Sequence, residues 1–404
     1  MELVHGHLAV EAPAGVPVWD VDPYDEAVLI EPLPLFRRLH GVPFAHLERY
    51  AMLICGRYDV VREVFSDHAR FVSSRGVGVS DFALEAPWRP PSIVLEVDPP
   101  AHDRTRKVLM RALSPKVVRD LRGAFAADAA ALMDALVVQG EIEAVADLAE
   151  AFPTRVFPRA VGIRTPDARK LVDYGAMVFN ALGPDNDLRR RIMARGPEIV
   201  PWINAACTRA QLEPGGIGAA IHADETITEA EAEMLVRSLL SAGVDTTVTA
   251  LGSAMWCLAH APDQYALLRS DPEKYALPAF EETMRLTSPV QAFCRTAAQD
   301  TEVAGVQIRE GTKILCVLGA ANVDPGQWGA KAEAFDITRK AAGHLALGVG
   351  VHTCVGQNIA RAEGQAVLRA LATRALRIEP LEGAAWRPNN AIRALDRLPL
   401  RLHG

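Results

Sequence analysis

The 404-residue chain lacks the features that direct a protein to a membrane or to nucleic acid. No uninterrupted apolar run reaches the roughly 18 residues that a membrane-spanning helix needs. The segment Met1 to Asp20 has neither the basic start nor the hydrophobic stretch of a signal peptide. The net charge is −7, and the lysines and arginines form no stripe that could follow a phosphate backbone. We therefore expect a cytoplasmic protein that binds neither membranes nor nucleic acid.

The sequence also lacks the linkers, repeats and low-complexity tracts that separate domains. Half of its residues are hydrophobic, which is enough for a large core, so we expect a single domain over residues 1–404. No two cysteines have CxxC spacing, which is typical of reduced thiols and predicts neither a zinc site nor a disulfide framework. The six cysteines are Cys55, Cys207, Cys257, Cys294, Cys316 and Cys354.

Helical periodicity dominates the middle of the chain. Apolar residues recur at spacings of three and four in alanine-rich segments, which predicts amphipathic helices. These segments are Val117 to Val138, Thr165 to Asn180 and Arg189 to Leu212, and a further helix is expected at Val355 to Leu376. Short runs predict small strands at Tyr50 to Cys55, Glu302 to Ala304, Val306 to Ile308 and Lys313 to Leu318. The expected fold is mainly α with small antiparallel β-sheets.

The longest predicted helix runs from Glu229 to about His260. It is opened by a capping box, Thr228-x-x-Glu231, and ends before Pro262. A helix of about 32 residues is roughly 48 Å long, which is sufficient to cross a whole domain. Because this segment is apolar on most faces, we expect the helix to run through the interior.

An apolar, glycine-rich segment from Leu347 to Gly356 holds one cysteine and stands just before a predicted helix. Gly350 and Gly356 permit tight backbone conformations and the close approach of a flat ligand. The amide N–H groups and the positive end of the following helix stabilise a thiolate at Cys354. A thiolate bound to haem iron favours cleavage of the O–O bond. The alternative is a buried structural cysteine, but that does not account for the Gly-x-His-x-Cys-x-Gly spacing.

With these residues the sequence resembles the cytochrome P450 superfamily from about residue 50 to the C-terminus. The resemblance implies that haem b lies between the long central helix and the helix after the cysteine, with Cys354 as the axial ligand of the iron. The superfamily pattern has a phenylalanine seven residues before the cysteine, where this chain has Leu347. An aromatic contact on the sulfur side of the haem is thereby lost, so we expect altered redox tuning rather than loss of haem.

The middle of the long helix contains Ala242-Gly243-Val244-Asp245-Thr246-Thr247, a concentration of poor helix formers. Gly243 lets a flat ring or dioxygen lie against the backbone, and a local distortion frees carbonyls for water. The resemblance implies that Asp245 and Thr246 are an acid–alcohol pair for oxygen activation, in which Asp245 rotates to pass protons inward. Without the cysteine loop, the same residues would equally fit a helix kink whose threonines bond back to carbonyls.

Further charged residues are expected to hold the haem and the scaffold around it. Glu282-Thr283-Met284-Arg285 resembles the superfamily's Glu-x-x-Arg, which with Arg339 implies a buried network that serves folding and haem retention. The residues that by resemblance contact the haem propionates are His102, Arg106, Arg295, His344 and His352. In isolation, the Glu282 and Arg285 pair would be an ordinary exposed ion pair, and His102 with Arg106 a solvated helix face.

Four segments make the resemblance closer than superfamily level: Trp88-Arg89-Pro90-Pro91-Ser92, Tyr174 through Pro184, Arg237 through Ser241, and Val290-Gln291-Ala292-Phe293. They resemble the bacterial monooxygenases that O-demethylate 4-methoxybenzoate, which bind a small benzoate by its carboxylate and hold the para substituent over the iron. This implies a narrow pocket that sets regioselectivity by positioning.

Two groups of residues are expected to line that pocket. Those that would bind the carboxylate are Arg89, Ser92, Ser238 and Ser241, and those that would form a flat apolar slot are Phe179, Leu182, Val290 and Phe293. Without the resemblance, the serines would be interpreted as local caps and the aromatics as core. By the same resemblance, Leu182 stands where those monooxygenases carry an aromatic residue, so bulkier or differently substituted acids are also expected to fit.

The predicted function is a cytochrome P450 monooxygenase that uses O2 to oxidise small aromatic carboxylic acids, by O-demethylation or hydroxylation of para-substituted benzoates such as 4-methoxybenzoate. Electrons are expected from NAD(P)H through a flavin-containing ferredoxin reductase and an iron–sulfur ferredoxin, since the chain carries no such module. Two alternatives stay open: a P450 monooxygenase for another small hydrophobic substrate, and a haem sensor or carrier without turnover. A peroxygenase that uses H2O2 is disfavoured by Asp245 and Thr246.

Overall fold

The computed structural model describes residues 11–404, so the first half of the N-terminal segment considered for a signal peptide lies outside the described residues. The helices are α1 (Glu26–Ile30), α2 (Leu33–His40), α3 (Tyr58–Ser66), α4 (Ala101–Ala112), α5 (Pro115–Gln139), α6 (Ala151–Val161), α7 (Ala168–Asn180), α8 (Asp187–Met193), α9 (Gly196–Ala206), α10 (Ile217–His222), α11 (Glu229–Gly243), α12 (Asp245–His260), α13 (Pro262–Ser270), α14 (Pro272–Thr287), α15 (Leu318–Ala321), α16 (Pro325–Trp328) and α17 (Gln357–Arg374).

The strands are β1 (Val18–Trp19), β2 (Ala45–Leu47), β3 (Met52–Cys55), β4 (Phe71–Val72), β5 (Glu141–Glu143), β6 (Ala292–Ala297), β7 (Thr301–Val303), β8 (Val306–Ile308), β9 (Lys313–Val317), β10 (Arg377–Pro380), β11 (Ala385–Arg387), β12 (Ala394–Arg397) and β13 (Pro399–His403). The largest sheet has the order β1-β2-β3-β9-β6-β4. It is mixed, because β1 pairs with β2 and β3 with β9 in parallel, and the other pairs are antiparallel.

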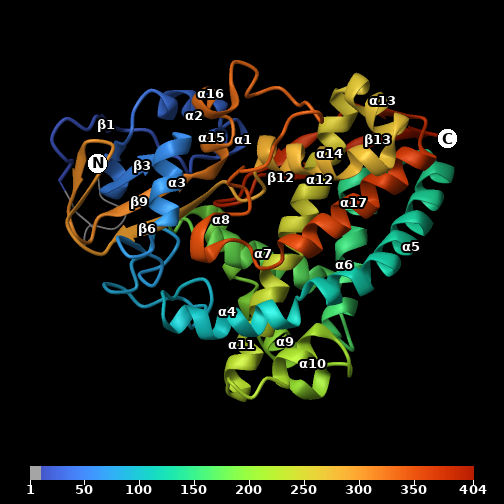
Figure 1. Ribbon diagram of the computed structural model, residues 1–404, viewed down its shortest axis with the longest axis horizontal. Coiled ribbons are helices and arrows are strands. Elements are labelled where there is room, and N and C mark those ends of the chain that lie inside the picture. The colour runs from blue at the N-terminus through green and yellow to red at the C-terminus, as the bar shows by residue number, and fades with distance from the viewer. Residues whose placement is uncertain (1–10) are drawn as a thin grey trace.

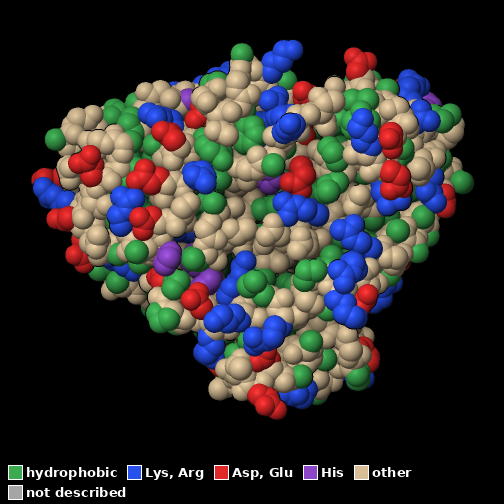
Figure 2. Space-filling view, in the orientation of Figure 1, with side chains coloured by type: hydrophobic (Ala, Val, Ile, Leu, Met, Phe, Trp, Pro, Cys, Tyr) green, Lys and Arg blue, Asp and Glu red, His purple; other side chains and the backbone are tan. Residues whose placement is uncertain are grey.

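The sheet and the helices occupy different parts of the molecule (Figure 1). The six-stranded sheet lies at one side together with the N-terminal helices α1, α2 and α3, and the long helices α5, α12, α14 and α17 form the other side. The expected class, mainly α with small sheets, is confirmed. No helix among the described residues has both the length and the apolar character needed to cross a bilayer. Charges of both signs are interspersed over the face shown in Figure 2.

The predicted helix from Glu229 to His260 is two helices in the structure. The capping box of Thr228 and Glu231 is present, but the helix is interrupted at Val244, where α11 ends and α12 begins. The side chains of Thr246 and Thr247 donate to the carbonyl oxygens of Ala242 and Gly243, at 2.5 and 2.9 Å. These hydroxyls compete for the helix carbonyls, which accounts for the break.

Gly243, the last residue of α11 before this break, is explained by a packing contact. A Cβ atom at Gly243 would lie 2.4 Å from the Phe157 ring, so the α6 side chain fills the space that the missing side chain leaves. The close approach of a flat ring or dioxygen to the backbone at Gly243 stays a prediction, because Gly243 also lines the cavity described below. Its missing side chain in addition permits close packing of α6 against α11.

The helix after the cysteine begins at Gln357, two residues later than predicted, and packs against α5 and α14. Its buried residues join those of α5, α6, α11, α12 and α14 in one large apolar core. A smaller cluster joins Phe179 at the end of α7 to Val290 and Ile392, with Leu182 and Phe293 packed against it. Because this cluster draws on three distant parts of the chain, it fixes the shape of one wall of the site described next.

Candidate active site

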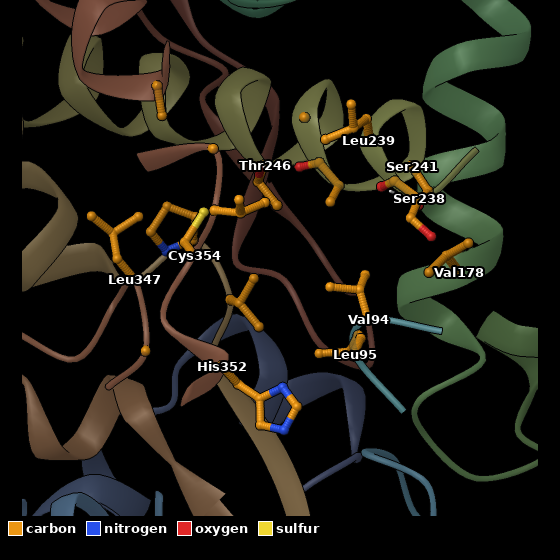
Figure 3. Close-up of a pocket in the computed structure, with 18 of the residues that line it drawn as sticks. Val94, Leu95, Val178, Ser238, Leu239, Ser241, Thr246, Leu347, His352 and Cys354 are labelled. Carbon is orange, nitrogen blue, oxygen red and sulfur yellow. Dashed lines mark hydrogen bonds between the residues drawn. The ribbon is translucent and has the colours of Figure 1, made fainter. Parts of the chain in front are cut away.

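A cavity lies between the α11–α12 break, the cysteine segment and β6. Figure 3 shows Cys354 and Leu347 toward one end, Ser238, Ser241 and Val178 toward the other, and Thr246 between them. The structure thus brings the cysteine and the threonine, which are more than a hundred positions apart in the sequence, to one apolar space.

Cys354 enters the cavity on a turn that is tied to Leu347. The backbone N–H of Cys354 donates to the carbonyl of Leu347 at 2.8 Å, and the side chain of Leu347 itself lines the cavity. Burial raises the pKa of the Cys354 thiol, while the backbone N–H groups of Gly356 and Gln357 and the guanidinium of Arg106 act in the opposite direction. The start of α17 therefore supplies donors to a thiolate at this position.

Gly350 occupies the other tight turn of this segment. Its φ is +76°, and a Cβ atom there would lie 3.0 Å from the carbonyl oxygen of Phe65. Both facts require glycine, because L side chains rarely adopt this backbone conformation. His352 follows this turn, two residues before the cysteine, and lies on the cavity wall.

Thr246 and Asp245 project to different sides of α12. Thr246 lines the cavity, and Asp245 is fully buried beyond it. The Asp245 side chain lies against Gly175 of α7, and its Oδ1 is 3.7 Å from a guanidinium nitrogen of Arg387. Neither of its carboxyl oxygens has a hydrogen-bond partner among residues 11–404.

The charge environment of Asp245 suits a proton carrier. Burial raises its pKa to about 6, Arg387 acts in the opposite direction, and Glu150 and Asp173 raise it further. A carboxyl with this pKa exchanges protons readily near neutral pH. Rotation of its side chain is the step that would carry a proton from the α7 side of the helix to the Thr246 side.

Four of the predicted haem residues line the cavity, and their chemistry fits a flat dianionic ligand with an axial thiolate. These residues are Arg106, Arg295, His352 and Cys354. The Arg295 guanidinium is 2% exposed, donates to the carbonyl of Cys294, and forms no salt bridge within the described chain. Burial lowers the pKa of both Arg106 and Arg295, which carboxylates of a bound ligand would oppose.

The two histidines next to these arginines also have free ring atoms. The rings of His102 and His352 meet edge to face at 4.6 Å between centroids. In the part of the chain that is described, Nε2 of His102 and both ring nitrogens of His352 have no hydrogen-bond partner, although Nε2 of His352 is 3.9 Å from Asp98 Oδ1. Buried donors without partners beside a thiolate and two arginines are the groups that haem propionates would satisfy.

His344 and His102 do not line the cavity. The structure instead places His344 against Glu281, with Nε2 at 3.1 Å from Oε2, and the same carboxylate binds Arg361 of α17. Glu281 therefore joins α14 both to α17 and to the loop that carries His344, whereas His102 lies behind His352.

All eight predicted substrate residues line the cavity. They are Arg89, Ser92, Phe179, Leu182, Ser238, Ser241, Val290 and Phe293. The hydroxyls of Ser92 and Ser238 lie 3.5 Å apart, and Ser238 also donates to the Met234 carbonyl at 2.8 Å. Arg89 is paired, because its Nη1 lies 3.1 Å from Oε2 of the buried Glu96.

The scaffold residues form one buried group away from the cavity. Glu282 and Arg285 are both 0% exposed and meet in two hydrogen bonds of 2.8 Å. Arg339 donates to the same carboxylate at 3.0 Å. Arg285 also donates to backbone carbonyls of residues 322, 332 and 334, so this group ties α14 to the chain that leads to the cysteine segment.

Several residues that line the cavity were not among the expected site residues. Arg237 is a second cation there, and its Nη1 donates to Asn204 Oδ1 at 3.3 Å. Tyr174 and Phe157 add aromatic surface, and Leu95 and Val178 add aliphatic surface. Arg237 could have been found from the sequence, because it precedes Ser238 in one of the quoted segments. Whether its side chain points into the cavity, however, depends on the face of the helix that it occupies and not on the motif.

Comparison with known proteins agrees with this geometry. A sequence model described as Cytochrome P450 matches residues 216–380. Cytochrome p450 CYP199A2 of Rhodopseudomonas palustris is 48% identical over 394 residues, covering 96% of this chain and 95% of that protein. The beta-dihydromenaquinone-9 omega-hydroxylase of Mycobacterium tuberculosis is 31% identical over 395 residues, or 94% of this chain and 78% of that protein. The solved structure of CYP109Q5 from Chondromyces apiculatus superposes with a TM-score of 0.79 at 27% identity, covering 95% and 98% of the two chains.

The fold and the thiolate cavity are those of haem-thiolate oxygenases. The chain belongs to the cytochrome P450 family and is a monooxygenase, as the sequence analysis predicted. The family uses a haem iron with a thiolate ligand and O2, and it takes electrons from NAD(P)H through redox partners. When bound, the haem supplies reductive activation of O2. The residues of this chain that fit the group are Cys354 for the iron and Arg106, Arg295 and His352, with His102 behind it, for the propionates.

Proposed function

We propose that this monooxygenase oxidises small para-substituted aromatic carboxylic acids, with 4-methoxybenzoate as the representative substrate. The observation that carries the proposal is the convergence of eight residues from four distant segments on the one cavity that also holds Cys354 and Thr246. Their polar members stand apart from the thiolate: Ser238 and Ser241 lie toward the end of the cavity opposite Cys354 (Figure 3).

The polar end suits a carboxylate. Arg89 and Arg237 both line it, together with three serine hydroxyls that can turn toward a ligand. The charge of Arg89 is offset by its ion pair with Glu96. The Glu96 side chain is 4% exposed and also accepts from the Ser92 N–H at 2.7 Å. The second cation, Arg237, therefore leaves the polar end with net positive charge, which an acid substrate neutralises.

The apolar end suits a flat ring with a small para group. Phe179, Leu182 and Val290 belong to or pack against one apolar cluster, which holds them as a rigid wall. A ring anchored by its carboxylate at the serines extends toward Thr246 and Cys354, so its para substituent is the part that reaches the reacting end. For a methoxy group, insertion of one oxygen atom into a C–H bond gives a hemiacetal that collapses to a phenol and formaldehyde.

We also propose an iron–sulfur ferredoxin and a flavin-containing reductase as the electron donors. Members of this family from bacteria normally use such partners. Lys and Arg side chains are numerous over the α5 and α17 side of the molecule in Figure 2, where Arg122, Arg369 and Arg374 line a shallow groove. Arg369 pairs there with Glu273 and Arg374 with Asp134, whereas Arg122 donates to the neutral amide oxygen of Gln365. The positive charge that remains on this groove favours an acidic partner.

The proposed substrate class is tested by optical titration of the haem-loaded enzyme. We expect 4-methoxybenzoate to shift the Soret band to the blue, and Arg89→Ala to weaken its binding by about 10- to 100-fold, because a hydrogen bond to a charged group is lost. Arg119→Ala, which removes an exposed arginine from α5, serves as the matched control. Binding of the methyl ester as tight as that of the acid would refute a carboxylate anchor.

A double variant separates the two charges at the polar end. Arg89→Ala alone leaves Glu96 as a buried carboxylate without its partner, and that carboxylate repels an acid ligand. Arg89→Ala with Glu96→Gln removes the repulsion while a side-chain oxygen remains for the Ser92 N–H. We expect the double variant to bind 4-methoxybenzoate more tightly than the single variant and less tightly than the unaltered enzyme.

A further inference from the structure

Lys313 is a buried cation outside the cavity, and its ammonium is surrounded by backbone carbonyls. The side chain leaves β9 and is 1% exposed. Its Nζ lies within hydrogen-bond distance of four carbonyl oxygens of one loop, so one of its three N–H groups is shared between two of them: Arg75 at 3.1 Å, Gly76 at 3.1 Å, Gly78 at 3.2 Å and Ser80 at 2.6 Å. Nearby Asp81 is paired with Arg75, at 2.5 Å between Nη2 and Oδ2.

The loop of residues 75–80 holds its shape around this ammonium. Four carbonyl dipoles that point at one spot repel one another, and a buried carbonyl left unpaired is costly. The three N–H donors of an ammonium offset both effects at once. Gly76 makes the turn possible, since its φ is +90° and a Cβ atom there would lie 2.7 Å from the Ser80 carbonyl oxygen. The Lys313 ammonium is thus a bound cation that four backbone carbonyls surround.

The outer side of the same loop contacts the substrate cavity wall. The Val79 N–H donates to the carbonyl of Leu182 at 2.8 Å. A Cβ atom at Gly78 would lie 2.4 Å from the same carbonyl, so the two backbones are in direct contact. On the neighbouring strand, the Cys294 N–H donates to the Val77 carbonyl at 2.7 Å, next to Phe293. The loop is therefore hydrogen-bonded to Leu182 itself and to Cys294, the residue that follows Phe293.

A continuous chain of contacts leads from Lys313 to the slot. Leu182 and Phe293 both line the cavity, whereas Lys313 does not. Thr296 and Lys313 are register partners of β6 and β9, so the strand that carries Phe293 is itself paired with the strand that carries the lysine. Displacement of the loop would release the Leu182 carbonyl and the strand edge together.

We propose that Lys313 is a positioning residue for substrate selection: as an internal cation, it holds residues 75–80 against Leu182 and Phe293 and so sets the width of the slot. It acts through the loop and not by contact with substrate. The inference concerns the site of the proposed function and in that respect rests on it. Its structural part, that the loop and the Leu182 segment depend on the ammonium, holds for any substrate.

The test replaces the ammonium and follows the loop directly. Lys313→Met keeps most of the side-chain length without the charge, and Lys340→Met removes an exposed lysine as the matched control. Hydrogen exchange of the haem-loaded enzyme should show faster exchange at residues 75–82 and 180–186 in Lys313→Met, with an unchanged absorption band of the reduced CO complex. The dissociation constant of 4-methoxybenzoate should rise by about tenfold. The preference for it over a longer 4-alkoxybenzoate should fall, because the slot is wider.

A rescue experiment separates positioning from a general loss of stability. Lys313→Ala removes Cγ, Cδ, Cε and Nζ, which propylammonium can replace, while propanol has the same apolar part without the charge. We expect propylammonium, and not propanol, to restore slow exchange at residues 75–82 and the original preference between the two acids. Exchange and preference in Lys313→Met equal to those of the unaltered enzyme would overturn the proposal. If the unaltered enzyme does not bind 4-methoxybenzoate, the substrate proposal fails, and the exchange measurement still decides the role of Lys313.

Discussion

Glu363 lies in the middle of α17 and is fully buried, and neither carboxyl oxygen has a hydrogen-bond partner within residues 11–404. Burial raises its pKa to about 8, and the nearby Thr247 hydroxyl opposes the shift. Folding therefore keeps a proton on this carboxyl that the unfolded chain releases near the ordinary value of 4.5. The folded state binds more protons between these two pKa values, so this group lowers the free energy of unfolding as the pH rises from 4.5 to about 8.

Glu363→Gln should remove this dependence, because the amide carries no titrating proton. We expect the variant to be more stable than the unaltered enzyme at pH 8 by about 1–3 kcal/mol, and the difference to vanish toward pH 4.5. Denaturant unfolding of the haem-loaded enzyme at several pH values measures it, with the exposed Glu382→Gln as the control. A stability difference that does not change between pH 5 and pH 8 would contradict a protonated Glu363.

At the level of single residues, motifs gave the type of chemistry and the structure gave the direction of each side chain. Asp245 and Thr246 are adjacent in the sequence, yet one faces Gly175 and the other the cavity. His344 and His352 both stand within ten residues before the cysteine, and only His352 lines the cavity. Adjacent residues of a helix point about 100° apart, and the direction of a loop residue depends on the local turn of the backbone. A motif specifies neither of these directions.

At the level of secondary structure elements, the contact between α7 and α12 controls Asp245. A Cβ atom at Gly175 would lie 2.6 Å from the Cβ of Asp245 and 3.1 Å from its Oδ2. Gly175→Ala should therefore displace the carboxyl or separate the helices. We expect turnover to fall by about tenfold or more while substrate affinity changes less, because proton delivery and not binding is affected.

The measurement for Gly175→Ala is product formed per NADH consumed, together with the substrate titration. Gly123→Ala in α5 is the matched control, since nothing lies within 4 Å of its Cβ position. That control should keep full turnover and gain up to about 1 kcal/mol in stability from better helix propensity. Normal turnover in Gly175→Ala would show that Asp245 tolerates the new methyl group.

At the level of the whole molecule, the buried carboxylate of Glu282 joins α14 to the chain before the cysteine segment. Glu282→Ala leaves Arg285, which is 0% exposed, without its carboxylate. Removing one member of a buried ion pair typically costs about 3–5 kcal/mol, so we expect a loss of this size and easier loss of haem.

Thermal unfolding and the fraction of haem retained on heating measure this effect. Glu281→Ala is a demanding control, because the neighbouring carboxylate also binds two basic side chains, His344 and Arg361, but is 18% exposed. We expect a clearly smaller loss for Glu281→Ala, since the Arg361 side chain that it leaves behind is 26% exposed and water can solvate its charge. Equal losses of stability and haem in the two variants would show that the deeper burial of Glu282 does not increase its contribution to stability.

The sequence by itself determined the family and the helical class, because each depends on residue types at short spacing or on a 3.6-residue period. It also predicted the thiolate ligand, the acid–alcohol pair and the residues of the substrate slot. Only the tertiary structure decided the helix break at Val244, the pairing of Arg89 with Glu96, the place of Gly243 against Phe157, and the loop held by Lys313. These features arise from contacts between residues far apart in the chain, where geometry and burial, and not local pattern, select the partner.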